Sequence, residues 1–411
     1  MAASGQTKRT RRGWLWRGLA ALALGSTLLA GAFTAGCTSL GDTPSGEHLK
    51  RLQKSPQWHD GSFHNVEPQW SDAAGAWRRL LFGASTPDVQ PATPVPVVRT
   101  DPALLAQPPA SGLRATWFGH SSTLVEIDGV RVLIDPFWGE RASPVPWAGP
   151  KRWFPPPIAL DALPAIDAVI ISHDHYDHLD RTAVEGLKSS HALFVVPPGI
   201  GAHLARWHVP AERIVELDWW ESRRIGGIEI TATPARHKSG RFIGQQDKTL
   251  WAGFALVGPK HRVWYSGDTG FHGELARIGE RLGPFDLTLL DAGQYDTLWP
   301  DTHLGPEAAV RAHQLVRGVT LMPVHWALLK EANHGWTEPA ERVLAAARCA
   351  GVTVALPRPG ESIEPTRARP VARWWPELPW QTAASAPVAA TKKGEPGERF
   401  EVDACRKEKP V

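Results

Sequence analysis

At 411 residues the chain is long enough to bury one large core or two smaller ones. Its composition, with 42% hydrophobic and 21% charged residues, is ordinary for a soluble globular protein, and a formal net charge of +3 gives no reason to expect nucleic-acid binding. The unusual feature is 20 Trp against 3 Tyr. Trp suits a packed core, but it also suits binding clefts and lipid–water boundaries, where the ring is apolar and the N–H can stay wet.

Residues 1–36 have the pattern of an export segment. An uncharged run over residues 18–36 follows a basic stretch and leads directly to Cys37. The basic residues are Lys8, Arg9, Arg11, Arg12 and Arg17. Because the run is long enough to span a bilayer, an uncleaved membrane anchor is the alternative to a cleaved signal.

Two short motifs refine this expectation. Thr34-Ala35-Gly36-Cys37 resembles a bacterial lipoprotein cleavage box, in which Cys37 becomes the lipidated first residue, although Thr34 stands where Leu is usual. Residues 10–15, with Arg11-Arg12, also resemble a twin-arginine signal, and the general secretory route is the alternative. We expect an exported protein of the cell envelope, lipid-anchored at Cys37 and facing the periplasm.

Residues 37–110 form an N-terminal extension that becomes Pro-rich towards its end, with a short amphipathic helix expected over 75–82. Its aromatic residues are expected to pack on the main domain rather than face lipid. They are Trp58, Phe63, Trp70, Trp77 and Phe82.

A compact domain is predicted over residues 111–366. Strands are expected at 115–118, 123–127, 130–134, 168–171, 193–196, 228–233, 251–257, 262–265, 287–290, 319–322 and 352–356, and helices at 182–188, 200–207, 274–282, 307–316 and 339–350. Strands first, and then strands interleaved with helices, predict a layered α/β architecture in one domain.

Residues 367–411 are expected to be a mostly disordered tail, because they are rich in Ala, Pro, Lys and Glu. Trp374, Trp375 and Trp380 are an exception that could fold back onto the domain. Neither Cys349 nor Cys405 belongs to a CxxC pair, which excludes a Cys-rich metal site. Cys349 lies in a helical pattern and is expected to be a small buried residue rather than a disulfide partner.

The densest cluster of residues that could bind a metal follows the predicted strand at 168–171. Three imidazoles and three carboxylates occur within eight residues, at His173, Asp174, His175, Asp177, His178 and Asp180. A solvated loop that happens to be His-rich is the alternative, but the H-x-H-x-D-H spacing is far more specific than a lone His. His nitrogens and Asp oxygens are the ligands of zinc or a similar ion, so this stretch is predicted to be half of a metal site.

Three further residues follow predicted strands and supply the other half: His237, Asp268 and His325. Side chains two apart on a loop converge, so His173 and His175 are expected to share one ion. Asp177 and His178 then point to a neighbouring ion.

The order H-x-H-x-D-H, His, G-D-T-G, His resembles the metallo-β-lactamase superfamily, and within it the N-acylphosphatidylethanolamine-hydrolysing phospholipase D family. The supporting segments are Gly119-His120-Ser121-Ser122, Ile134-Asp135-Pro136, Gly149-Pro150-Lys151-Arg152, residues 172–180, Glu216-Leu217-Asp218-Trp219-Trp220, Gly267-Asp268-Thr269-Gly270 and Val324-His325-Trp326. The resemblance implies a four-layer αββα sandwich with two zinc ions in the cleft between the sheet ends.

The same resemblance assigns residues to roles. His173, His175 and His237 would hold one zinc, Asp177, His178 and His325 the other, and Asp268 would bridge the two. Two such ions lower the pKa of a water and stabilise charge on a phosphoryl oxygen. Asp177 would also steer a proton, Asp135 would orient a ligand, and Tyr176 and His303 would contact the substrate phosphate. Asp174 departs from the Asn that is usual in the family.

The expected activity is hydrolysis of an N-acylphosphatidylethanolamine-like glycerophospholipid, at a membrane surface, to an N-acylethanolamine and phosphatidic acid. The alternatives are a dizinc acyl hydrolase, such as a lactonase or β-lactamase-like enzyme, and a non-catalytic protein that keeps zinc for structure. The sequence leaves the oligomeric state open, a dimer included.

Overall fold

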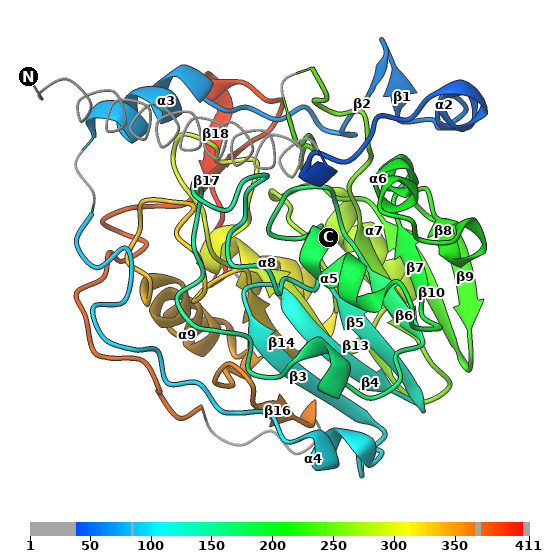
Figure 1. Ribbon diagram of the computed structural model, residues 1–411. Coiled ribbons are helices and arrows are strands. Elements are labelled where there is room, and N and C mark those ends of the chain that lie inside the picture. Colours follow the sequence, from blue (N-terminus) through cyan, green and yellow to red (C-terminus); the bar gives the residue numbers. More distant parts are fainter. Residues whose placement is uncertain (1–37, 84–85, 243, 366–370, 406–411) are drawn as a thin grey trace, which may run out of the picture.

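Two seven-stranded sheets stacked face to face form the centre of the molecule (Figure 1). The structure is a computed structural model that describes residues 38–83, 86–242, 244–365 and 371–405. In the first sheet the order is β16 (Ser362–Ile363), β3 (Leu113–Gly119), β4 (Ser122–Ile127), β5 (Val130–Ile134), β6 (Ala168–Ile170), β7 (Leu193–Val196) and β8 (Ile214–Glu216). In the second it is β15 (Thr353–Val354), β14 (Gly318–Val324), β13 (Phe285–Asp291), β12 (Arg262–Tyr265), β11 (Gly253–Val257), β10 (Ile228–Thr233) and β9 (Ser222–Ile225).

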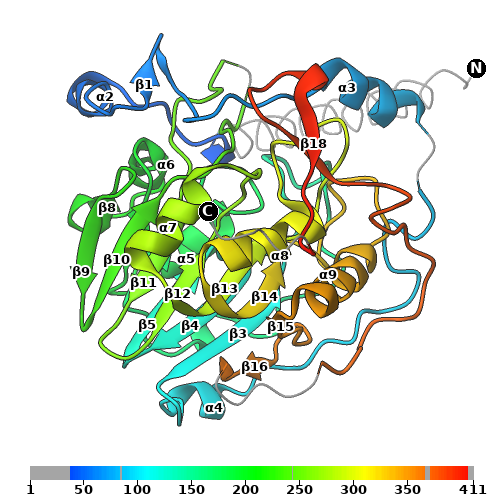
Figure 2. The same ribbon diagram turned by 180° about the vertical axis from the view of Figure 1, so that it is seen from behind.

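Helices cover the outer face of each sheet. Figure 1 shows α5 (Arg181–Leu187) and α6 (Ile200–Arg206) in front of the first sheet. From behind, α7 (Glu274–Leu282), α8 (Gly305–Leu315) and α9 (Glu338–Ala350) cover the second (Figure 2). The predicted αββα sandwich is therefore confirmed.

The predicted apolar strands are buried on both faces. In β5, Val132 and Ile134 belong to the core between the sheets, whereas Leu133 packs towards α5 and α6. In β6, Ile170 and Val169 divide in the same way. Strands covered on both sides read as continuous apolar runs rather than as an alternating pattern, which is why the sequence located them well.

The directions of the strands bring the polar residues that follow them to one edge of the two sheets. β5 and β6 run parallel, as do β12, β13 and β14. Two antiparallel steps make β3 parallel to β5 and β10 parallel to β12. The carboxyl ends of these strands therefore meet, and the polar residues that follow them lie together.

Residues 38–83 of the N-terminal extension cross this end of the molecule, whereas its later part runs along the side to α4 (Pro102–Ala106) at the opposite end (Figures 1 and 2). Before α4 the extension contains α2 (Gly46–Leu52), β1 (Trp58–His59), β2 (Ser62–Phe63) and α3 (Ala73–Phe82). Phe63 is buried and Trp58 packs edge-on against it at 4.9 Å, as expected, but Phe82 is 83% exposed. The predictions for residues 1–37 and for the Trp77 side chain fall outside the described residues. Among the helices that are described, none has the length and apolar character needed to cross a membrane.

The predicted disorder of the tail is wrong for residues 371–405. This C-terminal segment forms the hairpin β17 (Ala389–Thr391) and β18 (Arg399–Glu401), which lies beside α3 in both views (Figures 1 and 2). A disulfide joins Cys405 to Cys349 of α9, so the prediction of an unpaired Cys349 is also wrong. Small apolar residues such as Ala390 and Ala404 are buried against the domain. Local composition cannot reveal that burial, because the covering surface is distant in sequence.

Tryptophans pack behind one of the ligand candidates. Trp326, which follows His325, stacks on Trp117 with ring centroids 5.5 Å apart. Trp374 of the C-terminal segment lies 5.4 Å from Trp326 and 5.3 Å from Trp375. Much of the high Trp content therefore serves core packing rather than a lipid boundary.

Candidate metal centre

The loop of residues 171–180 is fixed at both ends. It leaves β6 at the sheet edge, where the Ser172 N–H donates to Asp135 Oδ1 at 2.8 Å. It ends at Asp180, whose carboxylate accepts hydrogen bonds from Thr182 and Ala183 and so caps α5. Because both ends are tied down, the side chains between them point in fixed directions.

One group of possible ligands consists of His173, His175, His237 and Asp268. His173 Nε2 lies 2.8 Å from His175 Nδ1, and His237 Nε2 lies 3.4 Å from the same atom. Asp268 Oδ2 is 3.7 Å from His173 Nε2 and 3.8 Å from His237 Nε2. The structure thus brings together the residues that the sequence assigned to the first ion.

A second group adjoins it and consists of His120, Asp177, His178 and His325. His178 Nε2 lies 2.8 Å from Asp177 Oδ2. Asp268 Oδ2 lies 3.1 Å from His178 Nε2 and 3.3 Å from His325 Nε2, although Asp268 belongs to the first group. Its position between the groups is the one required of a bridging ligand.

The arrangement of the donor atoms suits coordination of a metal ion better than it suits hydrogen bonding among the side chains. His178 Nε2 and Asp268 Oδ1 are buried and make no hydrogen bond in the described part of the chain, despite their charged and polar neighbours. Ligands of one tetrahedral ion, with bonds of about 2.1 Å, lie about 3.4 Å apart. Most of the separations above are close to that value, so the residues present suit two divalent cations such as zinc.

The outer nitrogens of the imidazoles have fixed partners. His178 Nδ1 donates to Asp135 Oδ2 at 2.6 Å, and the Tyr265 hydroxyl donates to the same oxygen. His237 Nδ1 donates to the Thr302 carbonyl at 2.9 Å. These contacts select the tautomer that turns Nε2 towards the centre, which is the role expected of groups behind a metal ligand.

The protonation states of most ligand candidates suit cation binding as well. His178 is the exception: burial acts to lower its pKa, but the carboxylates of Asp177, Asp268 and Asp135 raise it well above the ordinary value. Burial lowers the pKa of His175 to about 4 and lowers the pKa of three other imidazoles well below the ordinary value. Those three are His173, His237 and His325. Burial acts to raise the pKa of Asp177, but the neighbouring His178 and His120 hold it well below its usual range. Neutral nitrogens and an ionised carboxylate are the forms that coordinate metals.

A cleft of about 270 Å³ opens over the two groups. Tyr176 and His303, the predicted substrate contacts, both line it together with Glu331. His303 Nδ1 is 2.9 Å from Asp291 Oδ2, which holds the ring against the cleft wall. The Tyr176 hydroxyl donates to the Arg241 carbonyl at 2.9 Å, so it must break this bond before it can donate to a phosphate.

Three residues of the site were missed by sequence reasoning: His120, Asp291 and Glu331. His120 sits in the β3–β4 turn with a φ of 52°, and its Nε2 donates to Asp177 Oδ2 at 2.9 Å. Asp291 ends β13, and that position after a buried strand was the available signal. Glu331 gave no local signal, because Gln294 places it by accepting hydrogen bonds from the Glu331 and Ala332 N–H groups.

Asp174, the departure from the family pattern, faces the buried imidazole of His203. Its Oδ2 lies 3.4 Å from His203 Nε2, and its Oδ1 accepts a hydrogen bond from the Gly240 N–H at 2.7 Å. Burial acts to raise the pKa of Asp174, but the bond to His203 and the charge of that ring lower it to about 2. The extra carboxylate therefore points away from the ligand groups and towards α6.

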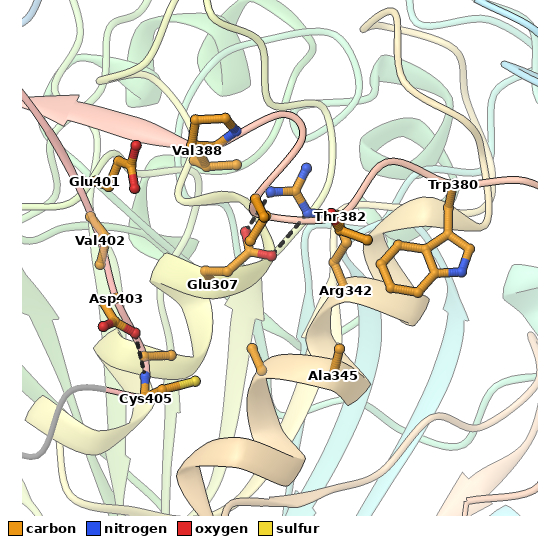
Figure 3. A pocket seen from close by; sticks show the side chains of 15 residues that line it. Glu307, Arg342, Ala345, Trp380, Thr382, Val388, Glu401, Val402, Asp403 and Cys405 are labelled. Carbon is orange, nitrogen blue, oxygen red and sulfur yellow. Dashed lines mark hydrogen bonds and ion pairs between the residues drawn. The ribbon is translucent and has the colours of Figure 1, made fainter.

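A larger cavity, about 400 Å³, lies elsewhere, between α8, α9 and the C-terminal segment (Figure 3). Trp380, Val388 and several Ala residues line it. Its central charges are paired, because Arg342 donates to both oxygens of Glu307 at 2.9 Å. Since its central ion pair is neutral and none of the ligand candidates lies in its wall, this cavity is not the candidate metal centre.

Comparisons with known proteins agree with this geometry. The beta-lactamase superfamily domain matches residues 130–326. A metal-dependent hydrolase of Pyrobaculum aerophilum is 30% identical over 215 residues, which cover 52% of this chain and 84% of that protein. The chain belongs to the metallo-β-lactamase family of metal-dependent hydrolases. An uncharacterized protein of Mycobacterium tuberculosis is 44% identical over 369 residues, 87% of this chain and 97% of that protein.

Other relatives match in part. The N-acyl-phosphatidylethanolamine-hydrolyzing phospholipase D 1 of Caenorhabditis elegans is 40% identical over 228 residues, 53% of this chain and 64% of that protein. The mitochondrial phospholipase D of that description from Saccharomyces cerevisiae is 30% identical over 238 residues, 56% of this chain and 50% of that protein. The resemblance to this group is thereby confirmed, while activity has to be argued from the site.

Proposed function

We propose that this hydrolase is a two-cation phosphodiesterase of phospholipase D type. Its substrate would be an N-acylphosphatidylethanolamine-like glycerophospholipid, cleaved to an N-acylethanolamine and phosphatidic acid. The similarity to the phospholipase of C. elegans, which is 40% identical over 228 residues, supports this substrate class.

The observation that carries the proposal is the position of Asp268. Its Oδ2 lies within 3.8 Å of four imidazoles drawn from both ligand groups, namely His173, His237, His178 and His325. Two cations held by these residues would lower the pKa of a water and would stabilise charge on the attacking and leaving oxygens of a phosphoryl group.

The chain's own residues would hold the reacting groups. Asp177, fixed by the His120 N–H, presents an ionised oxygen at the floor of the cleft, where it can accept a hydrogen bond from the attacking water and so steer its proton. His303, held by Asp291, faces the space where a phosphoryl oxygen would lie. Asp135 acts through His178, by keeping that ring in one orientation.

We also propose that the protein is exported and works at a membrane surface. The basic stretch, the uncharged run of residues 18–36 and Cys37 support either a lipid anchor or an uncleaved N-terminal anchor. In both cases a bilayer would hold the enzyme near a lipid substrate.

The test is release of N-acylethanolamine from vesicles that contain N-acylphosphatidylethanolamine, with metal content measured on the same protein. We expect turnover that a chelator abolishes, about two zinc ions per chain, and loss of both in Asp268→Ala. His191→Ala, at an exposed histidine outside the centre, is the matched control. Metal-loaded protein that turns over lactones or β-lactams but no phospholipid would overturn the proposal in favour of an acyl hydrolase.

A further inference from the structure

One group of three possible metal ligands lies apart from the candidate centre in the part of the chain that the structure describes. It consists of His59, Asp60 and His64, and one donor atom from each lies within 4.8 Å of the other two. The group surrounds the turn between β1 and β2, which lies next to α2 in both views (Figures 1 and 2). It shares no residue with the centre or with the cleft above it.

The ladder of the hairpin places the two imidazoles on one face. His59 pairs with Ser62, and the His64 N–H donates to the Gln57 carbonyl at 2.9 Å. Because residues two apart along a strand share a face, His59 and His64 are diagonal neighbours across the two strands. Their rings lie face to face, with centroids 3.6 Å apart and planes 16° apart.

Asp60 adds a carboxylate at the tip of the hairpin. Asp60 and Gly61 have φ values of 52° and 81°, and a two-residue type I′ turn requires a positive φ at both positions. Asp60 Oδ2 lies 3.5 Å from His59 Nδ1, close to the separation of about 3.4 Å between ligands of one tetrahedral ion. The side chains of His59 and Asp60 are 55% and 91% exposed, so both can rotate to complete a coordination sphere.

The backbone beneath the group is fixed to the domain. Phe63 is buried, and its N–H donates to the Asp247 carbonyl at 2.8 Å. Asn65, the next residue after His64, accepts a hydrogen bond from the His237 N–H at 3.0 Å and donates to the His237 carbonyl at 2.8 Å. Binding of a cation at the tip therefore requires rotation of side chains and no rearrangement of the hairpin.

The donor types select the class of ion. Two imidazoles and one carboxylate suit Zn²⁺ or Cu²⁺, whereas Ca²⁺ and Mg²⁺ take oxygen ligands. We propose that His59, Asp60 and His64 hold one further transition-metal cation, separate from those of the centre. Three protein ligands leave a position for water, so this ion would exchange with solvent more readily than ions in the buried centre. The proposal does not depend on the proposed function, because it uses no residue of the cleft.

The first experiment titrates Cu²⁺ into the full-length protein after the centre has been filled with zinc. Electron paramagnetic resonance counts the bound copper and its nitrogen ligands, and zinc content is measured alongside, so that copper replacing zinc in the centre is counted separately. We expect one further copper per chain with two nitrogen ligands. Its affinity should fall about tenfold or more in His64→Ala.

His59→Phe separates coordination from packing. The phenyl ring keeps an aromatic partner for the His64 ring but has no donor atom, so copper binding should fall as in His64→Ala. His191→Ala, at an exposed histidine outside the group, is the control and should leave binding unchanged. Copper bound equally by the wild type and by His59→Phe would overturn the proposal, because it would reveal an adventitious ion only and a histidine pair that serves hairpin packing.

The second experiment follows hydrogen exchange at the His64 amide, which bridges β1 and β2. In zinc-filled protein, free Zn²⁺ at ten times its dissociation constant for the site should slow this exchange about tenfold, because the ion must leave before the tip opens. Amides of the equally short hairpin β17–β18 are the control, since none of its residues belongs to a group of possible ligands. No slowing at His64, equal slowing in both hairpins, or slowing that His59→Phe retains would overturn the proposal.

Discussion

The metal centre and the two terminal segments are held in place by different means. The centre is built where parallel strands end, so the backbone of two sheets aims its ligand candidates at one point. Residues 38–43 and the C-terminal segment have no such frame and depend on a few buried side chains and one disulfide. The ligand candidates are therefore positioned by the order and direction of the strands. The terminal segments around them are positioned by individual side-chain contacts and by the disulfide.

The two kinds of region meet at the buried pair Arg236–Asp301. Arg236 donates to Asp301 at 2.8 Å and to carbonyls of Pro68 and Thr391, which belong to the N-terminal extension and the C-terminal segment. Arg236 precedes His237, and Asp301 precedes Thr302, whose carbonyl holds the His237 ring. Both terminal segments are thereby linked to a ligand candidate.

The largest expected effect is at the centre. His175→Ala removes one nitrogen from the first group, so we expect loss of metal and a fall in turnover of about a thousandfold or more. Because His175 is part of no core, unfolding measured with a chelator present should change by less than about 1 kcal/mol. Metal analysis and urea titration of the same samples check this, with His191→Ala as the control. Full metal content in His175→Ala would contradict the assignment.

Asp301→Ala tests the buried pair Arg236–Asp301, the junction between the metal centre and the terminal segments. It leaves Arg236 buried without its partner, which costs about 3–5 kcal/mol of unfolding free energy. Urea titration measures the loss, and the fraction of bound metal should also fall because His237 loses its support. Glu140→Ala is the matched control, since Glu140 and its partner Lys151 are 63% and 55% exposed and such surface pairs contribute little to stability. Similar losses in the two variants would show that the junction has no special role.

The C-terminal segment should matter for stability rather than for chemistry. Replacing Cys349 and Cys405 together by Ser opens a link between residues 56 apart, and the expected cost is about 2–4 kcal/mol. Turnover of a soluble diester at 25 °C should stay within about twofold. Thermal unfolding and activity assays check the two parts. A large loss of turnover without a loss of stability would place this segment in the working site.

Asp174→Asn gives the smallest expected effect. The amide keeps a bond to the Gly240 N–H but weakens the contact with His203, so we expect a loss of about 1 kcal/mol at neutral pH. Because the folded pKa of Asp174, about 2, lies below its ordinary value, the carboxylate stabilises the fold above pH 4. The difference between wild type and variant should therefore shrink as pH falls from 4 towards 2. A difference that grows on acidification would contradict this pairing.

Sequence reasoning located eleven of the fourteen strands of the two large sheets and most of the site, and it missed β8, β9 and β16. The runs at β5, β6 and β12 were visible because strands buried on both faces are continuously apolar. His237, Asp268 and His325 were found because each follows such a strand. The family resemblance supplied Asp135 behind His178, whereas Asp291 behind His303 was missed, because its partner is fixed only by folding.

The sequence by itself determined the ligand types, their order and their placement after strands, since these follow from local pattern and from the chemistry of His and Asp. Only the tertiary structure decided that Asp268 lies between the two groups, that Asp174 pairs with His203, and that residues 371–405 are folded against α9. The reason is physical: a strand end is a local property of the chain. A bridging position, an ion pair between distant residues and the burial of small side chains exist only after the sheets have packed.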